Sequence, residues 1–181
     1  MKIKFIITFL FLSFKTFALA KGLLVVTPIF GIEKTYKSSP FFKEKTRTYY
    51  GLRALLGPRF LRLEGELTQS KDDESLPEQN LTEEEKSTQA KLGIRSGFSA
   101  GPLGFYLRAG GNARKREFTT VQDGVTTTRG GAIKTSPYAG AGASLSAGGF
   151  FIDANITAVF SGEPKGSDYD TQSSLGIGFR F

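Results

Sequence analysis

The 181-residue chain contains no cysteine, no histidine and no tryptophan, and a single methionine. Without cysteine it can form no disulfide framework or thiolate metal site, and it lacks the acceptor of a lipid anchor. Without histidine it lacks the usual general base near neutral pH, the commonest metal ligand and every Ser-His or Cys-His nucleophile pair. Most familiar catalytic sites are therefore excluded, and any membrane attachment must come from the fold itself.

The N-terminus has the features of a secretory signal peptide. Lys2 and Lys4 precede a short apolar run, and an Ala-x-Ala sequence ends at Ala20. The alternative is a transmembrane anchor, but Lys15 ends the run after about ten residues, whereas a spanning helix needs roughly 20. We therefore expect residues 1–20 to be cleaved on export.

The remaining residues, 21–181, are expected to form one domain. Glycine (22) and phenylalanine (17) are abundant in a chain that is 39% hydrophobic, which favours β structure over helix. The formal net charge of +7 includes three lysines before Ala20, so these residues carry only +4. Their basic residues are spread over alternating positions instead of clustering, so nucleic-acid binding is not expected.

Eight segments of about ten residues alternate apolar residues with polar residues or glycine. The clearest one sets Leu61, Leu63 and Leu67 against charged neighbours. This pattern is the signature of a transmembrane β-barrel, in which apolar residues face lipid and polar residues face the lumen. We predict an all-β fold, a closed eight-stranded antiparallel up-and-down transmembrane β-barrel. Its strands are expected at residues 24–33, 48–56, 61–68, 90–98, 105–113, 139–145, 150–160 and 173–181.

The connections between these segments alternate in length, as in outer-membrane barrels with tight periplasmic turns and longer outer loops. Pro28 predicts a bulge or an irregular start in the first strand. Asp123-Gly124 is a type I′ hairpin signal, so the fifth and sixth strands are expected to continue beyond the membrane as a two-stranded ribbon. The long connections are expected at 35–46, 69–87, 115–131 and 161–170, and the short ones at 57–59, 99–103 and 147–149.

Aromatic residues gather beside the predicted short turns, where an interfacial girdle is expected. They are Phe60, Phe98, Phe105, Phe150 and the terminal Phe181. The alternative for these residues alone is the ordinary aromatic core of a soluble sandwich.

The predicted lumen face carries charges of both signs. An eight-stranded barrel is just wide enough to be filled by side chains, and charges removed from water must be paired. We therefore expect an internal ion-pair network; a narrow gated path for water or ions is the alternative. Glu64 and Glu66 share a face, but no nucleophile accompanies them. The lumen residues are Glu33, Arg53, Arg62, Glu64, Glu66, Lys91, Arg95, Arg108, Asp153 and Arg180.

Two connections carry further candidate sites. The acidic stretch 71–86 is expected to be a solvated loop, and Ca²⁺ binding by its carboxylates is the alternative, without EF-hand spacing to support it. Arg114, Lys115 and Arg116 follow the fifth strand, where a basic cluster can contact lipopolysaccharide phosphates. A plain solvated cluster is the other interpretation.

With these features, the chain resembles the small eight-stranded outer-membrane barrels, the group of the OmpA transmembrane domain and OmpX. Residues 137–145 also look like a glycine-rich strand of its porin-like branch. The resemblance implies that the final strand is the signal read by the barrel assembly machinery, carried here by Leu175, Ile177, Phe179 and Phe181. It also implies a bacterial outer-membrane location, periplasmic chaperones during biogenesis, contact with outer-membrane lipids and a monomer without a cofactor.

The enzymatic barrels of the outer membrane rely on a catalytic histidine, which this chain lacks. The resemblance therefore implies a non-enzymatic barrel with a structural or surface-interaction role through four outer loops. One alternative is a small narrow channel for ions or small solutes. Another is a soluble periplasmic lipocalin-like barrel, although such barrels place apolar residues inside.

Overall fold

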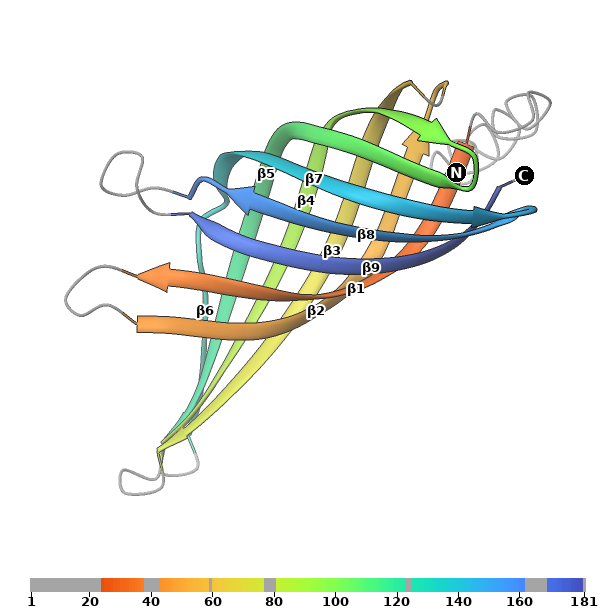
Figure 1. Cartoon of the computed structure of the whole chain (residues 1–181). Coiled ribbons are helices and arrows are strands. Elements are labelled where there is room, and N and C mark those ends of the chain that lie inside the picture. The colour runs from red at the N-terminus through yellow and green to blue at the C-terminus, as the bar shows by residue number, and fades with distance from the viewer. Residues whose placement is uncertain are drawn as a thin grey trace, which may run out of the picture.

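The computed structural model describes residues 24–37, 43–58, 60–76, 81–122, 125–161 and 169–180 (Figure 1). The predicted signal peptide, residues 1–20, and the terminal Phe181 lie outside the described residues. In the described ranges, no helix is long and apolar enough to cross a membrane. The strands of these ranges are β1 (Leu24–Lys37), β2 (Lys43–Leu56), β3 (Leu61–Leu76), β4 (Leu81–Ala100), β5 (Leu103–Gln122), β6 (Val125–Gly130), β7 (Lys134–Ala147), β8 (Phe150–Val159) and β9 (Asp170–Arg180).

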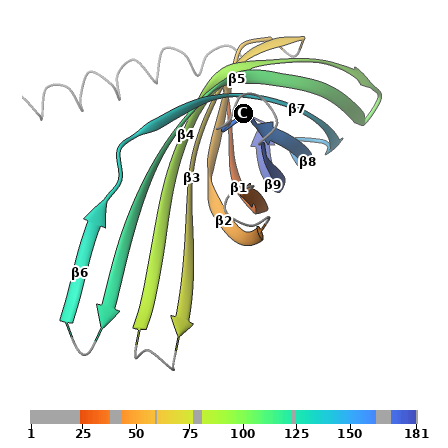
Figure 2. The ribbon, with the colours of Figure 1, turned by 90° about the vertical axis from the view of Figure 1, so that its left-hand side faces the viewer.

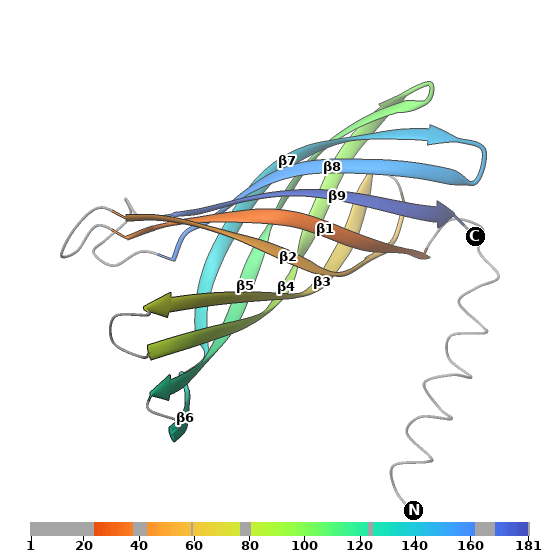
Figure 3. The ribbon, with the colours of Figure 1, turned by 90° about the horizontal axis from the view of Figure 1, so that it is seen from below.

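Eight of these strands form a closed antiparallel barrel, which confirms the predicted fold class. In this ring each strand pairs with the next in the order β1, β2, β3, β4, β5, β7, β8 and β9, and β9 pairs with β1; β6 pairs with β5 outside the ring. Figure 3 shows β1 and β9, the first and the last strand, side by side. Closure leaves no unpaired edge within the ring, as a barrel in lipid requires.

The barrel is polar inside and apolar outside. Within the barrel, side chains alternate between buried and exposed along the strands, and those that point outward include Leu67 and Leu92, which are 59% and 72% exposed. Arg53, Glu64 and Asp153 point inward and are almost fully buried. This arrangement reverses that of a soluble domain, and it confirms the predicted faces of the strands.

Four of the five aromatic residues predicted for the girdle, Phe60, Phe98, Phe105 and Phe150, are exposed beside the short turns, and Phe181 lies outside the described residues. Phe60 and Phe98 are more than two-thirds exposed. Phe98 packs against Phe105 with ring centroids 5.8 Å apart, and Phe150 packs against Phe179 at 5.4 Å. A soluble sandwich would bury these rings, so they fit the girdle of a membrane barrel.

Pro28 causes no bulge. The β1–β9 pairing lacks partners at Thr27 and Pro28, but the register is the same on both sides of the gap, from Val26 opposite Phe179 to Ile29 opposite Gly176. Of the two predicted forms, the bulge is therefore absent, and the irregularity is a gap in the ladder near the start of the strand. The missing N–H of proline interrupts the ladder without inserting a residue.

The largest difference from the sequence prediction concerns the long connections. Much of the expected loop 69–87 is strand, because β3 and β4 continue to pair as far as Leu76 opposite Leu81. Likewise, β5 continues to Gln122 and pairs with β6, which confirms the predicted hairpin, but β4 and β3 pair beside it, so the predicted two-stranded ribbon is part of a larger sheet. The sequence did not predict these strand ends because the outward residues there are polar as well, so no apolar alternation marks them.

The outer parts of β3, β4 and β5 join β6 in a four-stranded sheet that we call the extension (Figure 2). It begins where β5 loses its pairing to β7, after Arg114 opposite Lys134. From Arg114 to Gln122, β5 is about 25 Å long, as calculated from the rise per residue of an extended strand. The extension therefore projects well beyond the apolar band of the barrel.

An apolar cluster fills one side of the lumen at the short-turn end. It consists of Val25, Leu55 and Phe151, each at most 4% exposed. Gly178 makes room for it, because a Cβ there would lie 2.5 Å from Cζ of Phe151 and 3.0 Å from Oγ1 of Thr27. The tight contact explains a glycine at this inward position.

The first prediction concerns this glycine. Gly178→Ala forces the Phe151 ring to move, and we expect it to lower the free energy of unfolding by about 1–3 kcal/mol, the usual effect of overpacking. Urea unfolding in detergent micelles measures this change. Gly111→Ala is the matched control, because a Cβ there meets nothing within 4 Å. Equal effects of the two substitutions would contradict the packing role.

Candidate functional site

The lumen is the largest polar site of the described structure, and Arg53 lies at its centre. Arg53 comes from β2 and donates to Oε2 of Glu66 at 2.8 and 3.0 Å, and to Oδ1 of Asp153 at 2.7 Å. Glu66 lies on the neighbouring β3, whereas Asp153 lies on β8, across the barrel. One guanidinium therefore links strands on opposite sides of the lumen.

Glu66 is a shared acceptor. Lys91 donates to its Oε1 at 2.5 Å, and Arg108 donates to its Oε2 at 3.0 Å. Arg108 also pairs with Oε1 of Glu64 at 2.5 Å. Because both oxygens of Glu66 accept bonds from buried cations, this carboxylate is held in place and shielded from solvent. Such geometry suits a structural acceptor better than an acid or base in catalysis.

Three arginines stand in one row across neighbouring strands nearer the short-turn end. Arg62 of β3 is opposite Arg95 of β4, which is opposite Arg108 of β5. Arg95 donates to Oδ2 of Asp153 at 2.5 Å, and its guanidinium carbon lies 3.2 Å from the ring centre of Tyr106. Like charges in direct cross-strand positions repel, so the row depends on nearby acids and on this aromatic ring.

A second cluster lies toward the extension, around Glu33. Gln172 and Gln89 donate to Oε1 of Glu33 at 2.7 and 3.1 Å. Arg114 also donates to Glu33, and it pairs with Oδ2 of Asp170 at 2.7 Å. These side chains come from β1, β4, β5 and β9, so the second cluster also crosses the barrel.

A third group of charges lies at the base of the extension. There Arg47 donates to both carboxylate oxygens of Glu85, at 2.6 and 2.7 Å. Arg116 lies 3.5 Å from the same carboxylate, and Lys45 approaches it at 3.9 Å. Bidentate arginine–carboxylate pairs have fixed geometry and are among the stronger ion pairs. The lumen therefore contains three successive layers of paired charge.

Nine of the ten predicted lumen residues point into the barrel and are buried; the side chain of Arg180 lies outside the described residues. The sequence reasoning missed several further lumen residues: Arg47, Glu85, Gln89, Arg114, Asp170 and Gln172. Their positions continue the parity of the predicted strands. They were missed because the predicted strands were too short at the ends that lie toward the extension.

The predicted basic cluster is divided by the wall of the barrel. Arg114 points inward to Glu33 and Asp170, so it does not face lipid. Lys115 points outward and pairs with Glu117 at 2.7 Å. Consecutive residues of a strand point to opposite faces. The prediction of one cluster assumed that residues after the fifth strand form a loop, in which this alternation would not apply.

The acidic stretch 71–86 is likewise strand where the structure describes it, and its charges are paired there. Lys71 lies 3.1 Å from Glu84, and Lys45 pairs with Asp72. Among the described residues, no group of three or more acidic, histidine or cysteine side chains is arranged to hold a metal ion. A calcium site in this stretch therefore has no support from the described side chains.

A closed eight-stranded barrel with an apolar outer surface and a charged lumen defines the fold of small outer-membrane β-barrel proteins. No family model matches the chain, and no curated protein matches it. Solved structures do. Ail, the attachment invasion locus protein of Yersinia pestis, is 16% identical with a TM-score of 0.62, covering 89% of this chain and 99% of its own.

Two further solved structures have the same fold. Neisserial surface protein A is 15% identical with a TM-score of 0.63, covering 87% of this chain and 97% of its own. The N-terminal β-barrel domain of OprF from Pseudomonas aeruginosa is 16% identical with a TM-score of 0.53, covering 86% and 97%. At such identities the likeness shows the fold alone, and it agrees with the predicted resemblance.

The second prediction tests the central ion pairs. Arg53→Met leaves Glu66 and Asp153 without their shared cation, so we expect the free energy of unfolding to fall by about 3–5 kcal/mol. As a control, Lys71→Met removes the exposed ion pair with Glu84 and is expected to lower the free energy of unfolding by less than about 1 kcal/mol. Urea unfolding in micelles measures both. A loss for Arg53→Met no greater than that of the control would show that the network is dispensable.

Proposed function

We propose that this protein is a non-enzymatic outer-membrane β-barrel that presents the extension at the cell surface for interaction with partners. The observation that carries the proposal is the extension itself, since strands that only had to cross the membrane would end at the apolar band. The apolar exterior supports the membrane location. A lipocalin-like barrel would need the opposite arrangement, with apolar side chains lining its interior.

The extension offers backbone groups for binding. β6 pairs only with β5, and all of its side chains are exposed. The opposite edge of the extension is β3, whose residues beyond Ser70 pair only with β4. Open edges with free N–H and C=O groups can accept an extended segment of another protein. The name of one structural neighbour, an attachment protein, agrees with a surface role of this kind.

Contacts with outer-membrane lipid and lipopolysaccharide are a further part of the proposal. Lys115 lies on the outer face of β5, two residues beyond Ala113 of the apolar surface. It donates to Glu117 at 2.7 Å and so holds the pKa of that carboxyl below its ordinary value. Its outward direction supports the proposal that, of the predicted basic cluster, Lys115 contacts a lipid phosphate.

For biogenesis, we propose that the final strand is read by the barrel assembly machinery after delivery by periplasmic chaperones. Leu175, Ile177 and Phe179 are each more than half exposed on the outer face of β9. Such a row is available to a receptor before the barrel inserts. Since β9 pairs with β1, the same strand closes the ring. The closed ring needs no second copy, so we propose a monomer.

The third prediction tests location and orientation, and it uses the absence of native cysteine. We expect Thr128→Cys on β6 to react with a membrane-impermeant maleimide on intact cells. Ser99→Cys, at the short-turn end, is the matched control and should react only after the outer membrane is permeabilised. The protein should also pellet with outer membranes and migrate differently on gels before and after boiling. The reverse labelling pattern, or a soluble protein, would refute the proposal.

A narrow channel is the alternative function, and the lumen contacts argue against it. Arg53 reaches from β2 to Asp153 on β8, and Arg114 reaches from β5 to Glu33 on β1. Side chains therefore cross the lumen at two levels. The apolar cluster around Phe151 fills part of a third level.

The fourth prediction follows from this closure. Purified protein in planar bilayers should give a flat current trace, because ions would have to displace buried charge pairs. Arg53→Ala removes one crossing side chain and is expected to produce measurable conductance if it inserts normally. Steady conductance by the unmodified protein at the level of the variant would favour the channel instead.

A further inference from the structure

The outer wall of the barrel has an open hollow on the side of β4, β5 and β7. Its volume is about 280 Å³, and the outward residues that line it are Ala90, Leu92, Gly111, Ala113 and Thr135. The hollow lies in the apolar outer surface, which faces lipid. Packed matter must fill such a space in a bilayer, because an empty one forfeits van der Waals contacts.

Small residues in two adjacent cross-strand rows create the hollow. The rows, which run across β4, β5 and β7, are Leu92–Gly111–Pro137 and Ala90–Ala113–Thr135. A Cβ on Gly111 would meet nothing within 4 Å, so the space above this residue is open. Leu92 is 72% exposed and stands as a wall on one side. The shape is therefore a shallow apolar seat with one raised edge.

Two lysines lie at the end of the hollow that is nearer the extension. Lys115 is the next outward residue of β5 after Ala113, about 7 Å further along the strand. Lys86 lies on the neighbouring β4, opposite Glu117, which is the next outward residue of β5. Both lysine side chains are exposed. Exposed lysines beside a bilayer attract lipid phosphates.

An apolar seat directly below a pair of lysines matches a lipid that carries phosphate above its acyl chains. A second copy of this chain is another possible occupant, since small residues in a membrane let neighbouring surfaces approach closely. Two copies that met at this wall in one membrane would bring the same lysines together at the same depth, and like charges repel. The charges therefore favour a phosphorylated lipid.

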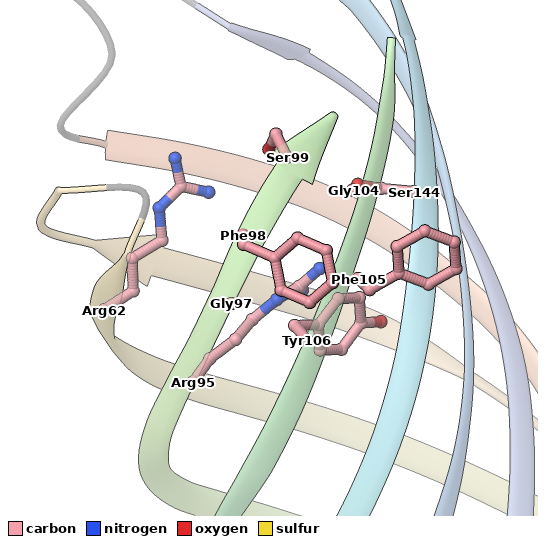
Figure 4. A pocket seen from close by; sticks show the side chains of 9 residues that line it. All are labelled: Arg62, Arg95, Gly97, Phe98, Ser99, Gly104, Phe105, Tyr106 and Ser144. Carbon is pink, nitrogen blue, oxygen red and sulfur yellow. The ribbon is translucent and has the colours of Figure 1, made fainter. Parts of the chain in front are cut away.

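The short-turn end of the barrel offers no equivalent seat among the described residues. The cavity there is about 40 Å³, and its lining includes Arg62, Arg95 and Ser99 (Figure 4). In this cavity the guanidinium of Arg95 lies against the ring of Tyr106. Its size and its polar groups do not suit a hydrocarbon chain.

We propose that the hollow binds one acyl chain of lipid A, the membrane anchor of lipopolysaccharide, while Lys115 and Lys86 bind its phosphate groups. The inference rests on the proposed function, which puts the extension at the cell surface and so puts this end of the barrel in the outer leaflet. It adds a defined binding site on β4, β5 and β7 to the lipid contact proposed for Lys115.

The test uses the absence of native tryptophan, which allows a single fluorescent reporter. Ile94→Trp places the reporter on the outer face of β4, two residues from Leu92, and Leu175→Trp places it on β9, across the ring. Each full mature protein is reconstituted in vesicles of brominated phosphatidylcholine, whose chains quench tryptophan. Unbrominated diphosphoryl lipid A is then added at increasing mole fraction, with phosphatidylglycerol in a parallel series.

Three variants are made in the Ile94→Trp protein. Ala113→Leu fills the hollow, and Ala154→Leu, at an outward alanine of β8, is its matched control. Lys115→Gln removes one phosphate contact and leaves the hollow unchanged.

We expect lipid A to relieve the quenching of the Ile94→Trp protein at a mole fraction about tenfold lower than for the Leu175→Trp protein. Ala113→Leu should abolish this difference, whereas Ala154→Leu should retain it. Lys115→Gln should reduce the preference about fivefold, the effect of one basic residue at a lipid surface.

Equal relief at the two reporters would mean ordinary lipid exchange and would overturn the proposal. Equal relief by phosphatidylglycerol would overturn the assignment to lipid A. A reporter on β4 that brominated chains do not quench would show that a second copy covers the hollow. Each of these failures leaves the proposed surface role untouched, because cysteine labelling on intact cells tests that role separately.

Discussion

The structure depends on one constraint: a β-sheet surrounded by lipid must satisfy every backbone hydrogen bond internally. Pairing of β9 with β1 closes the barrel and meets that constraint. The closed barrel in turn fixes how the side chains are arranged. Because strand side chains alternate, an apolar outer surface forces polar residues inward. Eight strands leave a lumen that side chains fill, so those polar residues must pair with one another. The ion-pair layers are thus a consequence of closure.

The lumen charges also show why buried ion pairs are arranged as networks. Glu66 accepts from Arg53, Lys91 and Arg108. Arg53 also binds Asp153 and Arg108 also pairs with Glu64, so the buried charges share partners and the cost of removing them from water is offset. The same network joins strands across the barrel and rigidifies the wall. A rigid wall is a suitable base for an extension that projects into solvent, where no lipid confines it.

Charge is distributed unevenly along the lumen. Toward the extension, arginines and carboxylates form closed pairs such as Arg47 with Glu85. At the short-turn end, an apolar cluster occupies the side of β1, β2 and β8, while Arg62 and Arg95 occupy the side of β3 and β4. The two ends of the barrel therefore have different chemistry, which suits a protein whose two mouths face different compartments.

The sequence by itself determined the number of strands, their membrane faces and the inward direction of nine charged residues, because lipid imposes a period of two on every spanning segment. It could not determine the strand ends beyond Ser70 or Arg114, since outward residues outside the apolar band are polar and remove the apolar alternation. Only the tertiary structure decided which charges meet. Arg53 with Asp153 and Arg114 with Asp170 are far apart in the chain, and barrel closure and register bring them together.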